Sequence, residues 1–384
     1  MRIGLLIDTL NSGGAQRQLV VLAKELKMLG HEVAVCVYMP GRFYVHELQR
    51  AQIELVELHP RNRWQKFTMV YAWLRKWRPH VLQAFLNGAN AIAELTSLLP
   101  HSWKIVASER YTGPPPNRVT RLKRQLHRRA DWITTNSYAN MEQILLAVPT
   151  LKAKSSVIWN MVDLEHFSPP AATPNRISDG LVRFLCVASM DPRKNALCLV
   201  EALHLLRRRN IHNFHVRWVG KVQPSACHTT TYEKMCSLVK QYQLENHFTF
   251  AGEKANVVHE YHAVDALVLV SLFEGLPNVV CEAMACGLPV VLSDVSDHRK
   301  MIDEGRTGFL CSPYEAGSIA DALQSIIHLP EGPRRVIGEL ARKAAEDQFN
   351  RERFIEEYEC VYRCLVKDAA GRNEMDPPCA DRLR

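Results

Sequence analysis

The chain has 384 residues, of which 47% are hydrophobic and 23% are charged, and its formal net charge is +8. This is the composition of an ordinary globular protein, and the length favours two domains over one. No stretch approaches about eighteen uninterrupted apolar residues, so we expect no transmembrane helix. The scattered cysteines predict free thiols and exclude a disulfide framework.

The positive charge is concentrated in the first half of the chain. Residues 1–167 hold 22 Lys and Arg against 12 Asp and Glu, a net +10, whereas residues 168–384 hold 26 against 28, a net −2. The first half is therefore expected to meet an anionic partner. Charge alone leaves open whether this partner is a membrane surface, nucleic acid or a phosphorylated substrate.

Short apolar runs alternate with helical patterns along the first half. The runs read as strands at 2–8, 32–38, 53–58, 80–85, 104–109 and 132–137. After the first of them, residues 15–30 carry apolar residues at helical spacing and end at Gly30, a common helix stop. Such alternation predicts a parallel sheet that is covered by helices on both faces.

The second half begins with a linker and repeats the alternation. Residues 168–181, SPPAATPNRISDGL, are rich in Pro and small polar residues, which is typical of a linker. Strands are then predicted at 182–189, 213–220, 247–252, 265–271, 288–294 and 307–312, with helices at 196–209, 231–243, 279–287 and 318–329. The predicted fold class is α/β, with two Rossmann-like doubly wound domains facing across a cleft, where ligands bind beyond the carboxyl ends of the strands.

Two glutamates lie in one of the most apolar parts of the chain. The segment EGLPNVVCE places Glu274 and Glu282 between a predicted strand and the start of a helix. An unpaired buried carboxylate is strongly unfavourable, so these side chains need partners. Free backbone N–H groups at the helix start can bind phosphate or sugar oxygens. A carboxylate there can also hold two vicinal hydroxyls. The alternative is that Glu274 is an ordinary turn residue and that the Glu282 carboxylate interacts favourably with the positive end of the helix dipole.

A series of segments resembles one family over nearly the whole chain. In chain order these are SGGAQRQLV, ADWITTNSYA, VIWNMVDLEHFSP, VASMDPRKN, WVGK, EGLPNVVCEAMACGLPVV and TGFLCSP. The chain is similar to the retaining glycosyltransferases of family 4 (GT4, group 1), which have the GT-B fold. The resemblance implies an N-terminal acceptor-binding domain at 1–170 and a C-terminal donor-binding domain at 171–349. It also implies that a helix at 350–366 joins the first domain; residues 367–384 are predicted to be a disordered tail.

The resemblance implies a donor site for a nucleotide diphosphate sugar, with UDP-hexose or UDP-HexNAc favoured. Glu274 would contact hydroxyls of the transferred sugar and Glu282 the ribose, with the backbone of Gly275 and Leu276 lining the sugar site. Lys194 matches the family lysine that stabilises charge on the departing diphosphate. These expectations make Glu274 and Lys194 catalytic candidates.

The chain departs from the family pattern beside Lys194. Ser189 occupies the position of the usual arginine, and either Arg193 compensates as a further catalytic residue or the Ser189 hydroxyl suffices. Gly13 and Gly14 precede a helix and are expected to meet the diphosphate and sugar. Gly220 is expected to lie against the nucleotide.

The acceptor site is less defined, and no metal is expected. The loop after the fourth predicted strand lacks the histidine that many relatives carry there, leaving Asn87 as a candidate. Glu109 and Arg110, at another strand end, are either acceptor-binding residues or part of an internal salt bridge. No aspartate pair at metal spacing is evident, and the family generally needs no divalent ion.

Two basic stretches account for the positive excess. Residues 59–80 combine six Lys and Arg with five aromatic residues, and residues 118–129 add six more basic residues. The pattern resembles a membrane-surface element, but it also fits core aromatics with a solvated basic face, or a single-stranded nucleic-acid site. We expect peripheral binding to an anionic membrane on its cytoplasmic side, with no nucleic acid.

The leading interpretation is an enzyme that transfers a sugar to a lipid-linked saccharide acceptor in surface polysaccharide or glycoconjugate biosynthesis. Two alternatives stay open: a degenerate GT-B module that binds nucleotide sugar without turnover, and a basic-surface nucleic-acid-binding protein. Turnover separates the first alternative from the enzyme. Salt-sensitive binding to oligonucleotides, without any response to UDP, would identify the second.

Overall fold

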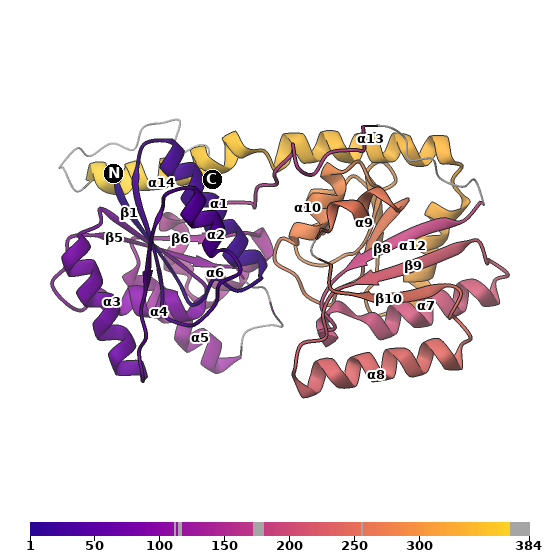
Figure 1. The fold of residues 1–384 in the computed structure, drawn as a ribbon, viewed down its shortest axis with the longest axis horizontal. Helices are drawn as coiled ribbons and strands as arrows, with labels where there is room; N and C mark the ends of the chain where they lie inside the picture. Colours follow the sequence, from indigo (N-terminus) through magenta and orange to yellow (C-terminus); the bar gives the residue numbers. More distant parts are fainter. Residues whose placement is uncertain (111–112, 114–116, 172–179, 255, 369–384) are drawn as a thin grey trace. The chain divides into compact units, whose positions relative to one another are not determined.

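The computed structural model describes residues 1–384 except 111–112, 114–116, 172–179, 255 and 369–384. It divides into two compact units. Unit 1 comprises Met1–Met161 together with helix α14 (Arg351–Asp368), and unit 2 comprises Val162–Asn350 (Figure 1). Most of the predicted linker and all of the predicted tail beyond Asp368 lie outside the described residues.

Unit 1 is built on a seven-stranded sheet in the order β3-β2-β1-β4-β5-β6-β7, in which every pair is parallel. Its strands are β1 (Arg2–Ile7), β2 (Glu32–Val37), β3 (Glu54–Glu57), β4 (Val81–Phe85), β5 (Lys104–Glu109), β6 (Trp132–Thr135) and β7 (Ser155–Val157). The helices besides α14 are α1 (Gly14–Met28), α2 (Val45–Arg50), α3 (Arg63–Trp77), α4 (Asn87–Thr96), α5 (Arg118–Arg124) and α6 (Tyr138–Ala147). The short 3-10 helices are η1 (Gln125–Arg129) and η2 (Pro149–Lys154).

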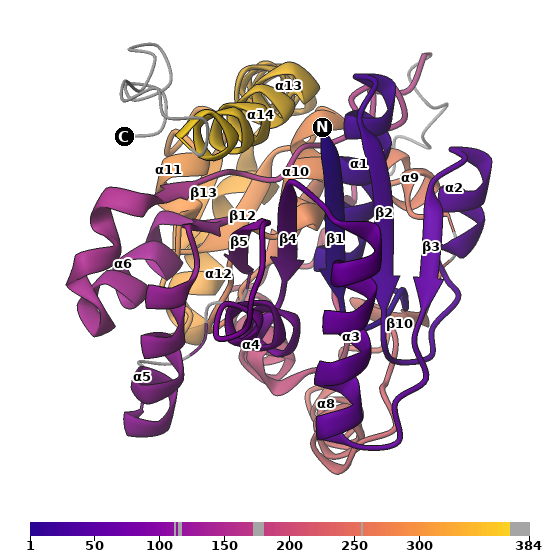
Figure 2. The same ribbon diagram turned by 90° about the vertical axis from the view of Figure 1, so that its left-hand side faces the viewer.

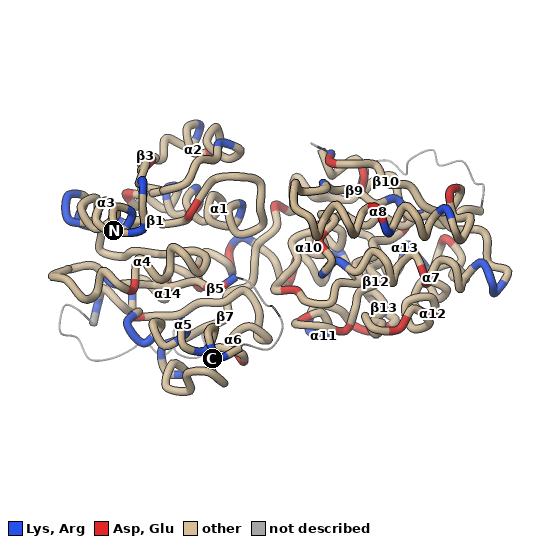
Figure 3. The backbone as a smooth tube through the Cα atoms, turned by 90° about the horizontal axis from the view of Figure 1, so that it is seen from below, with Lys and Arg blue, Asp and Glu red and all other residues tan. Residues whose placement is uncertain are grey.

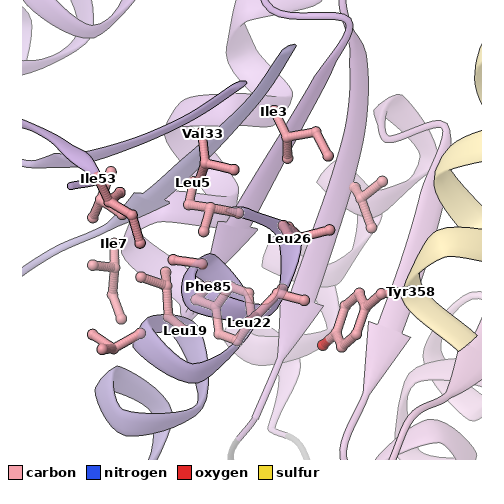
Figure 4. Close-up of a cluster of buried hydrophobic side chains, with 14 of the residues drawn as sticks. Ile3, Leu5, Ile7, Leu19, Leu22, Leu26, Val33, Ile53, Phe85 and Tyr358 are labelled. Carbon is pink, nitrogen blue, oxygen red and sulfur yellow. The ribbon is translucent and has the colours of Figure 1, made fainter. Parts of the chain in front are cut away.

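Two hydrophobic clusters cover the two faces of this sheet. Successive side chains of a strand point to opposite faces. Ile3, Leu5 and Ile7 of β1 accordingly pack with α1 and α14 (Figure 4), whereas Leu6 joins the cluster on α3 and α4. Figure 2 shows the same sheet and its helices from the side of this unit. Burial on both faces explains why the strands read as continuous apolar runs.

Unit 2 repeats the architecture with a six-stranded parallel sheet in the order β10-β9-β8-β11-β12-β13. The strands are β8 (Val182–Val187), β9 (Phe214–Val219), β10 (Phe248–Gly252), β11 (Ala266–Leu269), β12 (Val290–Ser293) and β13 (Gly308–Cys311). The helices are α7 (Ala196–Arg208), α8 (Ala226–Gln241), α9 (Val258–His262), α10 (Asn278–Ala285), α11 (His298–Met301), α12 (Ala316–His328) and α13 (Glu331–Gln348), with the 3-10 turn η3 (Pro192–Lys194).

The predicted α/β class with two doubly wound domains is confirmed, and every predicted strand is present. The sequence did not predict β7, which is three residues long and begins with two serines, nor the helices α2, α4, α6, α9, α11 and α13. The helical pattern of residues 121–130, RLKRQLHRRA, predicts one helix, and the structure has the end of α5 followed by the tighter η1. Helix α14 runs to Asp368, slightly beyond the predicted end.

Candidate functional site

Each sheet has one point where the chain reverses the direction in which it adds strands. In unit 2 this point lies between β8 and β11, and in unit 1 between β1 and β4. The loops that follow two such neighbouring strands leave toward opposite faces of the sheet, so ligands of open α/β sheets bind there. In unit 2 these two loops carry Lys194 and Glu274.

Lys194 and Glu274 form an ion pair between these two loops. Their side chains are only 18% and 12% exposed, respectively. Burial alone would raise the pKa of Glu274, but the neighbouring ammonium of Lys194 outweighs it and holds that pKa below its usual value. The site therefore presents an ionised carboxylate and a cation side by side.

The turn before α7 fixes Lys194 in place. Asp191 begins η3 and accepts a hydrogen bond from the backbone N–H of Arg193 at 2.9 Å. Asn195 follows in the left-handed conformation, with φ of 62°, and its side-chain amide donates to the carbonyls of Val270 (3.1 Å) and Pro313 (2.7 Å). These bonds tie the loop after β8 to the ends of β11 and β13.

Arg193 lies beside Lys194 but is engaged by its own neighbour. Its guanidinium donates to both carboxylate oxygens of Asp191, at 2.7 to 3.0 Å. Burial alone would raise the pKa of Asp191, and the bonds from Arg193 lower it instead. Ser189 is half-buried in the same loop. That Arg193 compensates for the arginine replaced by Ser189 stays a prediction.

The second glutamate lies on the buried side of helix α10. Glu282 is 3% exposed, and one of its carboxylate oxygens accepts a hydrogen bond from the Tyr261 hydroxyl at 2.8 Å. The Val279 carbonyl oxygen lies 3.2 Å from the same hydroxyl oxygen. Glu282 is the fifth residue of the helix, because the helix begins at Asn278, one residue before its predicted start. Tyr261 orients this carboxylate and was missed by the sequence reasoning.

The turn that carries Glu274 is braced by the loop after β12. The Ser296 hydroxyl donates to the carbonyl of Gly275 at 2.9 Å, and Leu276 is 5% exposed. This brace fixes the backbone that was predicted to line the sugar site.

Gly220 has a structural reason to be glycine. Its φ is 158°, and a Cβ at this position would lie 1.8 Å from the carbonyl oxygen of Ala188. The end of β9 therefore lies too close to the loop after β8, directly before Ser189, for a side chain to fit at this position. A contact between Gly220 and a nucleotide stays a prediction.

In unit 1 the corresponding loops carry the glycine pair and Asn87. Gly13 has φ of 179°, an extended conformation that any residue adopts, and Gly14 begins α1. Asn87 is exposed at the start of α4. The residue before it, Leu86, has φ of 74° and ψ of 156°, a region that is costly for any residue except glycine. This strain is located at the point where the sheet topology places a ligand.

Glu109 and Arg110 both lie in buried networks inside unit 1. Glu109 pairs with Arg124 and accepts a hydrogen bond from the His127 Nε2 at 3.1 Å, while the His127 Nδ1 bonds Glu94. Arg110 donates to Asn160 (2.6 Å) and to the hydroxyl of Tyr358. In the structure Glu109 forms an internal salt bridge with Arg124, which is the alternative to acceptor binding. Acceptor binding by either residue stays a prediction.

The four-residue cluster of Glu94, Glu109, Arg124 and His127 was not foreseen. Burial alone would lower the pKa of His127, but its hydrogen bonds to Glu109 and Glu94 raise it to about 9. Burial likewise acts to raise the pKa of Glu109, yet His127 and Arg124 lower it. The cluster thus holds two carboxylates and two cations in a neutral set.

Among the described residues no group of three or more His, Cys, Asp or Glu is arranged to hold a metal ion. In the same part of the chain, none of the helices combines the length and the apolar character that crossing a membrane requires.

Comparison with known proteins identifies this architecture as the GT-B fold of glycosyltransferases. A glycosyltransferase from Rickettsia africae has a TM-score of 0.81 at 20% identity, covering 96% of this chain and 99% of its own. The Anabaena protein HepE in complex with UDP has a TM-score of 0.80 at 18% identity, covering 97% and 100%.

Sequence models match both halves of the chain. The model of glycosyl transferases group 1 matches residues 172–344, and that of glycosyltransferase family 4 matches residues 12–166. The chain belongs to this family of group 1, family 4 glycosyltransferases.

Among curated relatives, the N-acetylgalactosamine-N,N'-diacetylbacillosaminyl-diphospho-undecaprenol 4-alpha-N-acetylgalactosaminyltransferase of Campylobacter jejuni is 23% identical, over 85% of this chain and 90% of its own. The N-acetyl-alpha-D-glucosaminyl L-malate synthase of Bacillus anthracis is 32% identical over 131 residues, which are 34% of either chain.

Proposed function

We propose that this protein is a retaining hexosyltransferase that moves a hexose or HexNAc from a UDP-sugar to a lipid-linked saccharide. Unit 2 binds the donor and unit 1 binds the acceptor. The observation that carries the proposal is the Lys194–Glu274 ion pair at the topological switch point of unit 2. A UDP complex of HepE and the undecaprenol-linked substrate in the name of the Campylobacter enzyme support the choice of donor and acceptor.

The two paired side chains suit the two ends of the breaking bond. The ionised carboxylate of Glu274 accepts hydrogen bonds from hydroxyls of the donor sugar. The Lys194 ammonium stabilises charge that grows on the leaving diphosphate, which provides the electrostatic part of catalysis without a metal. Glu282, oriented by Tyr261, holds the ribose hydroxyls.

Retention of configuration follows from attack on the face that the diphosphate leaves. The bond between the anomeric carbon and the phosphate oxygen breaks, and the acceptor oxygen forms a new bond to that carbon on the same face. The proton of the acceptor hydroxyl passes to the departing phosphate oxygen. No side chain of the protein is required as a nucleophile or a base.

The charged surface of unit 1 supports docking to an anionic membrane on its cytoplasmic side. Helix α3 buries Trp73 and Trp77 in the core, so these two aromatics are structural, whereas Trp64 is 77% exposed. The exposed Lys and Arg of α3 and α5 appear in blue in Figure 3. On α5, Leu122 is 73% exposed among them. Exposed apolar side chains flanked by cations suit an anionic lipid surface.

Donor binding is tested by thermal shift with UDP, GDP, ADP and UDP-sugars on the wild type, on Glu282→Ala and on the exposed control Glu245→Ala. A nucleotide at about 100 times its Kd adds roughly 2.7 kcal/mol of stability. We expect UDP to stabilise the wild type and the control, and Glu282→Ala to respond less. No response to any nucleotide would overturn the proposed donor site.

Transfer is tested with the bound UDP-sugar and lipid-linked glycan acceptors. NMR of the product determines whether the anomeric configuration is retained. Nucleotide binding without turnover on any acceptor would favour the degenerate binding module instead. Salt-sensitive oligonucleotide binding with no nucleotide response would favour the nucleic-acid-binding alternative.

Membrane docking is tested by pelleting with anionic and neutral liposomes at low and high salt. We expect binding to anionic vesicles alone, lost at high salt, and weakened by Arg63→Glu with Lys76→Glu on α3. The matched control carries Lys234→Glu and Lys240→Glu on α8 of unit 2. No pelleting with anionic vesicles at low salt would contradict docking.

A further inference from the structure

Ser296 has a backbone conformation that serine rarely adopts. It is the second residue of the turn at 295–298 after β12, which is closed by a hydrogen bond from the His298 N–H to the Val295 carbonyl at 3.2 Å. Its φ is 53°, and Asp297 after it has φ of −93° and ψ of 9°. Turns with a positive φ at the second residue favour glycine, because a Cβ is strained there. Serine at this position therefore carries a cost that glycine would avoid.

The hydroxyl of this strained residue bonds to the turn that carries Glu274. It donates to the Gly275 carbonyl at 2.9 Å, and Ser296 itself is half-buried. A glycine at 296 would relieve the strain, but it has no hydroxyl to replace this bond. The strained serine thus gives the loop after β12 a contact that the unstrained residue cannot provide.

Other contacts hold the part of this turn that precedes Gly275. The N–H of Leu272 donates to the Arg193 carbonyl at 2.8 Å, and the Glu274 carboxylate is held by its ion pair. Both of these contacts come from the loop after β8. The bond from Ser296 extends the support to the residue after Glu274, from the opposite neighbour of β11 in the sheet.

Fixing the Gly275 carbonyl also fixes the peptide that follows it. A peptide group is planar, so a hydrogen bond that holds its carbonyl oxygen sets the direction of the whole group between Gly275 and Leu276. This is the stretch of backbone that is expected to line the sugar site. Its orientation is therefore set by Ser296, which lies 21 positions further along the chain.

We propose that Ser296 is a positioning residue for the sugar part of the donor. Its hydroxyl holds the Gly275–Leu276 peptide in the orientation in which this backbone contacts the transferred sugar. The inference rests on the proposed donor site of unit 2 and adds a residue from outside the two loops that carry its charged pair. The ribose is assigned to Glu282, which the Tyr261 hydroxyl orients from α9. The effect of Ser296 is therefore expected on the sugar and not on UDP.

Three substitutions separate the hydroxyl of Ser296 from its backbone strain. Ser296→Gly removes both, Ser296→Ala removes the hydroxyl and keeps the strain, and Ser296→Thr keeps both. The control is Gln243→Gly, because Gln243 is exposed, has a similar φ of 51° and lies between α8 and β10. This control relieves strain of the same kind at a distance from the loops after β8, β11 and β12.

The test measures kcat/KM for the UDP-sugar, the inhibition constant of UDP and the melting temperature of each variant. We expect kcat/KM to fall about three- to tenfold in Ser296→Gly and Ser296→Ala, which is the equivalent of one hydrogen bond. It should keep the wild-type value in Ser296→Thr and Gln243→Gly, and the inhibition constant of UDP should keep its value in every variant. Ser296→Gly should melt above Ser296→Ala, because alanine retains the strain. A structural role alone would instead make activity follow the melting temperature.

The outcomes distinguish this inference from the proposed function. A wild type that neither binds nor turns over a UDP-sugar overturns the proposed function. An active wild type whose kcat/KM is unchanged in Ser296→Gly or Ser296→Ala overturns the role of Ser296. A folded Ser296→Thr with the same loss as the other two variants, or a UDP inhibition constant that rises as much as kcat/KM falls, also overturns it. Melting temperatures identify loss of folding, and either Ser296→Gly or Ser296→Ala is sufficient for the decision if it folds.

Discussion

The ammonium of Lys194 and the carboxylate of Glu274 form an ion pair across 80 positions of the chain, between the loops after β8 and β11. Each loop comes from one of the two strands that flank the reversal in strand order. The pair thus links two sequence motifs that lie far apart in the chain. The strongest prediction about turnover concerns the substitution of Lys194 in this pair.

Lys194→Ala should lower kcat by about 10²- to 10³-fold, the typical cost of removing one group that stabilises transition-state charge. KM for the donor should change less, because the charge on the diphosphate is greatest as it leaves. Steady-state kinetics with the UDP-sugar measure both constants. The exposed Lys234→Ala is the control. A kcat within a few-fold of the wild type would remove Lys194 from the catalytic residues.

Tyr261→Phe should weaken UDP binding about three- to tenfold. The hydroxyl that orients Glu282 is lost, and a hydrogen bond of this kind contributes about 0.5–1.5 kcal/mol. Calorimetric titration with UDP measures the change, and Tyr232→Phe on α8 is the control. Unchanged affinity in Tyr261→Phe would mean that Glu282 needs no support from this residue to hold the ribose.

Gly220→Ala should destabilise unit 2 by about 1–3 kcal/mol or more, because its Cβ would overlap the backbone of Ala188. Gly317→Ala is the matched control, since a Cβ there meets nothing within 4 Å on helix α12. Chemical denaturation of the two variants gives the comparison. If Gly220→Ala is as stable as Gly317→Ala, the loop after β8 can move away from the added Cβ. The Gly220→Ala variant should then retain activity.

The stability of the protein should fall as the pH rises from about 6.5 to about 9. His127 has a folded-state pKa of about 9, above the ordinary value of 6.5, so its contribution is complete below 6.5 and is lost as pH rises through 9. The slope is at most about 1.4 kcal/mol per pH unit for one proton. Urea denaturation across this range measures it. The His127→Gln variant should be less stable than the wild type at pH 6.5, and its stability should no longer fall with rising pH. If its stability falls as steeply as that of the wild type, other groups cause the pH dependence.

The strands and the loops that carry Lys194 and Glu274 could be predicted from the sequence because their signals are local. Runs such as residues 2–7 are apolar at every position, since helices cover both faces of each sheet. The loop residues Lys194 and Glu274 stand directly after such runs, and the topology rule then brings strand ends together. Only their direct ion pair, which needs side-chain geometry, was not predictable.

The residues that were missed depend on contacts between distant parts of the chain. Glu94, Glu109 and His127 come from α4, β5 and η1, and no spacing in the sequence relates them. The hydrogen bond between Tyr261 and Glu282 could not be predicted for the same reason. Strand β7 was missed because it lacks the apolar run that identified the others.

Helix α14 also determines the order in which the two units can fold during synthesis. Phe354, Tyr358 and Tyr362 lie in the same core as Ile3 and Leu26, so the hydrophobic centre of unit 1 is incomplete until the last part of the chain has been synthesised. Unit 2, a continuous segment of the chain, can fold on the ribosome before that moment. A ribosome that stops before residue 351 releases a protein whose unit 2 is finished and whose unit 1 is open to chaperones and proteases.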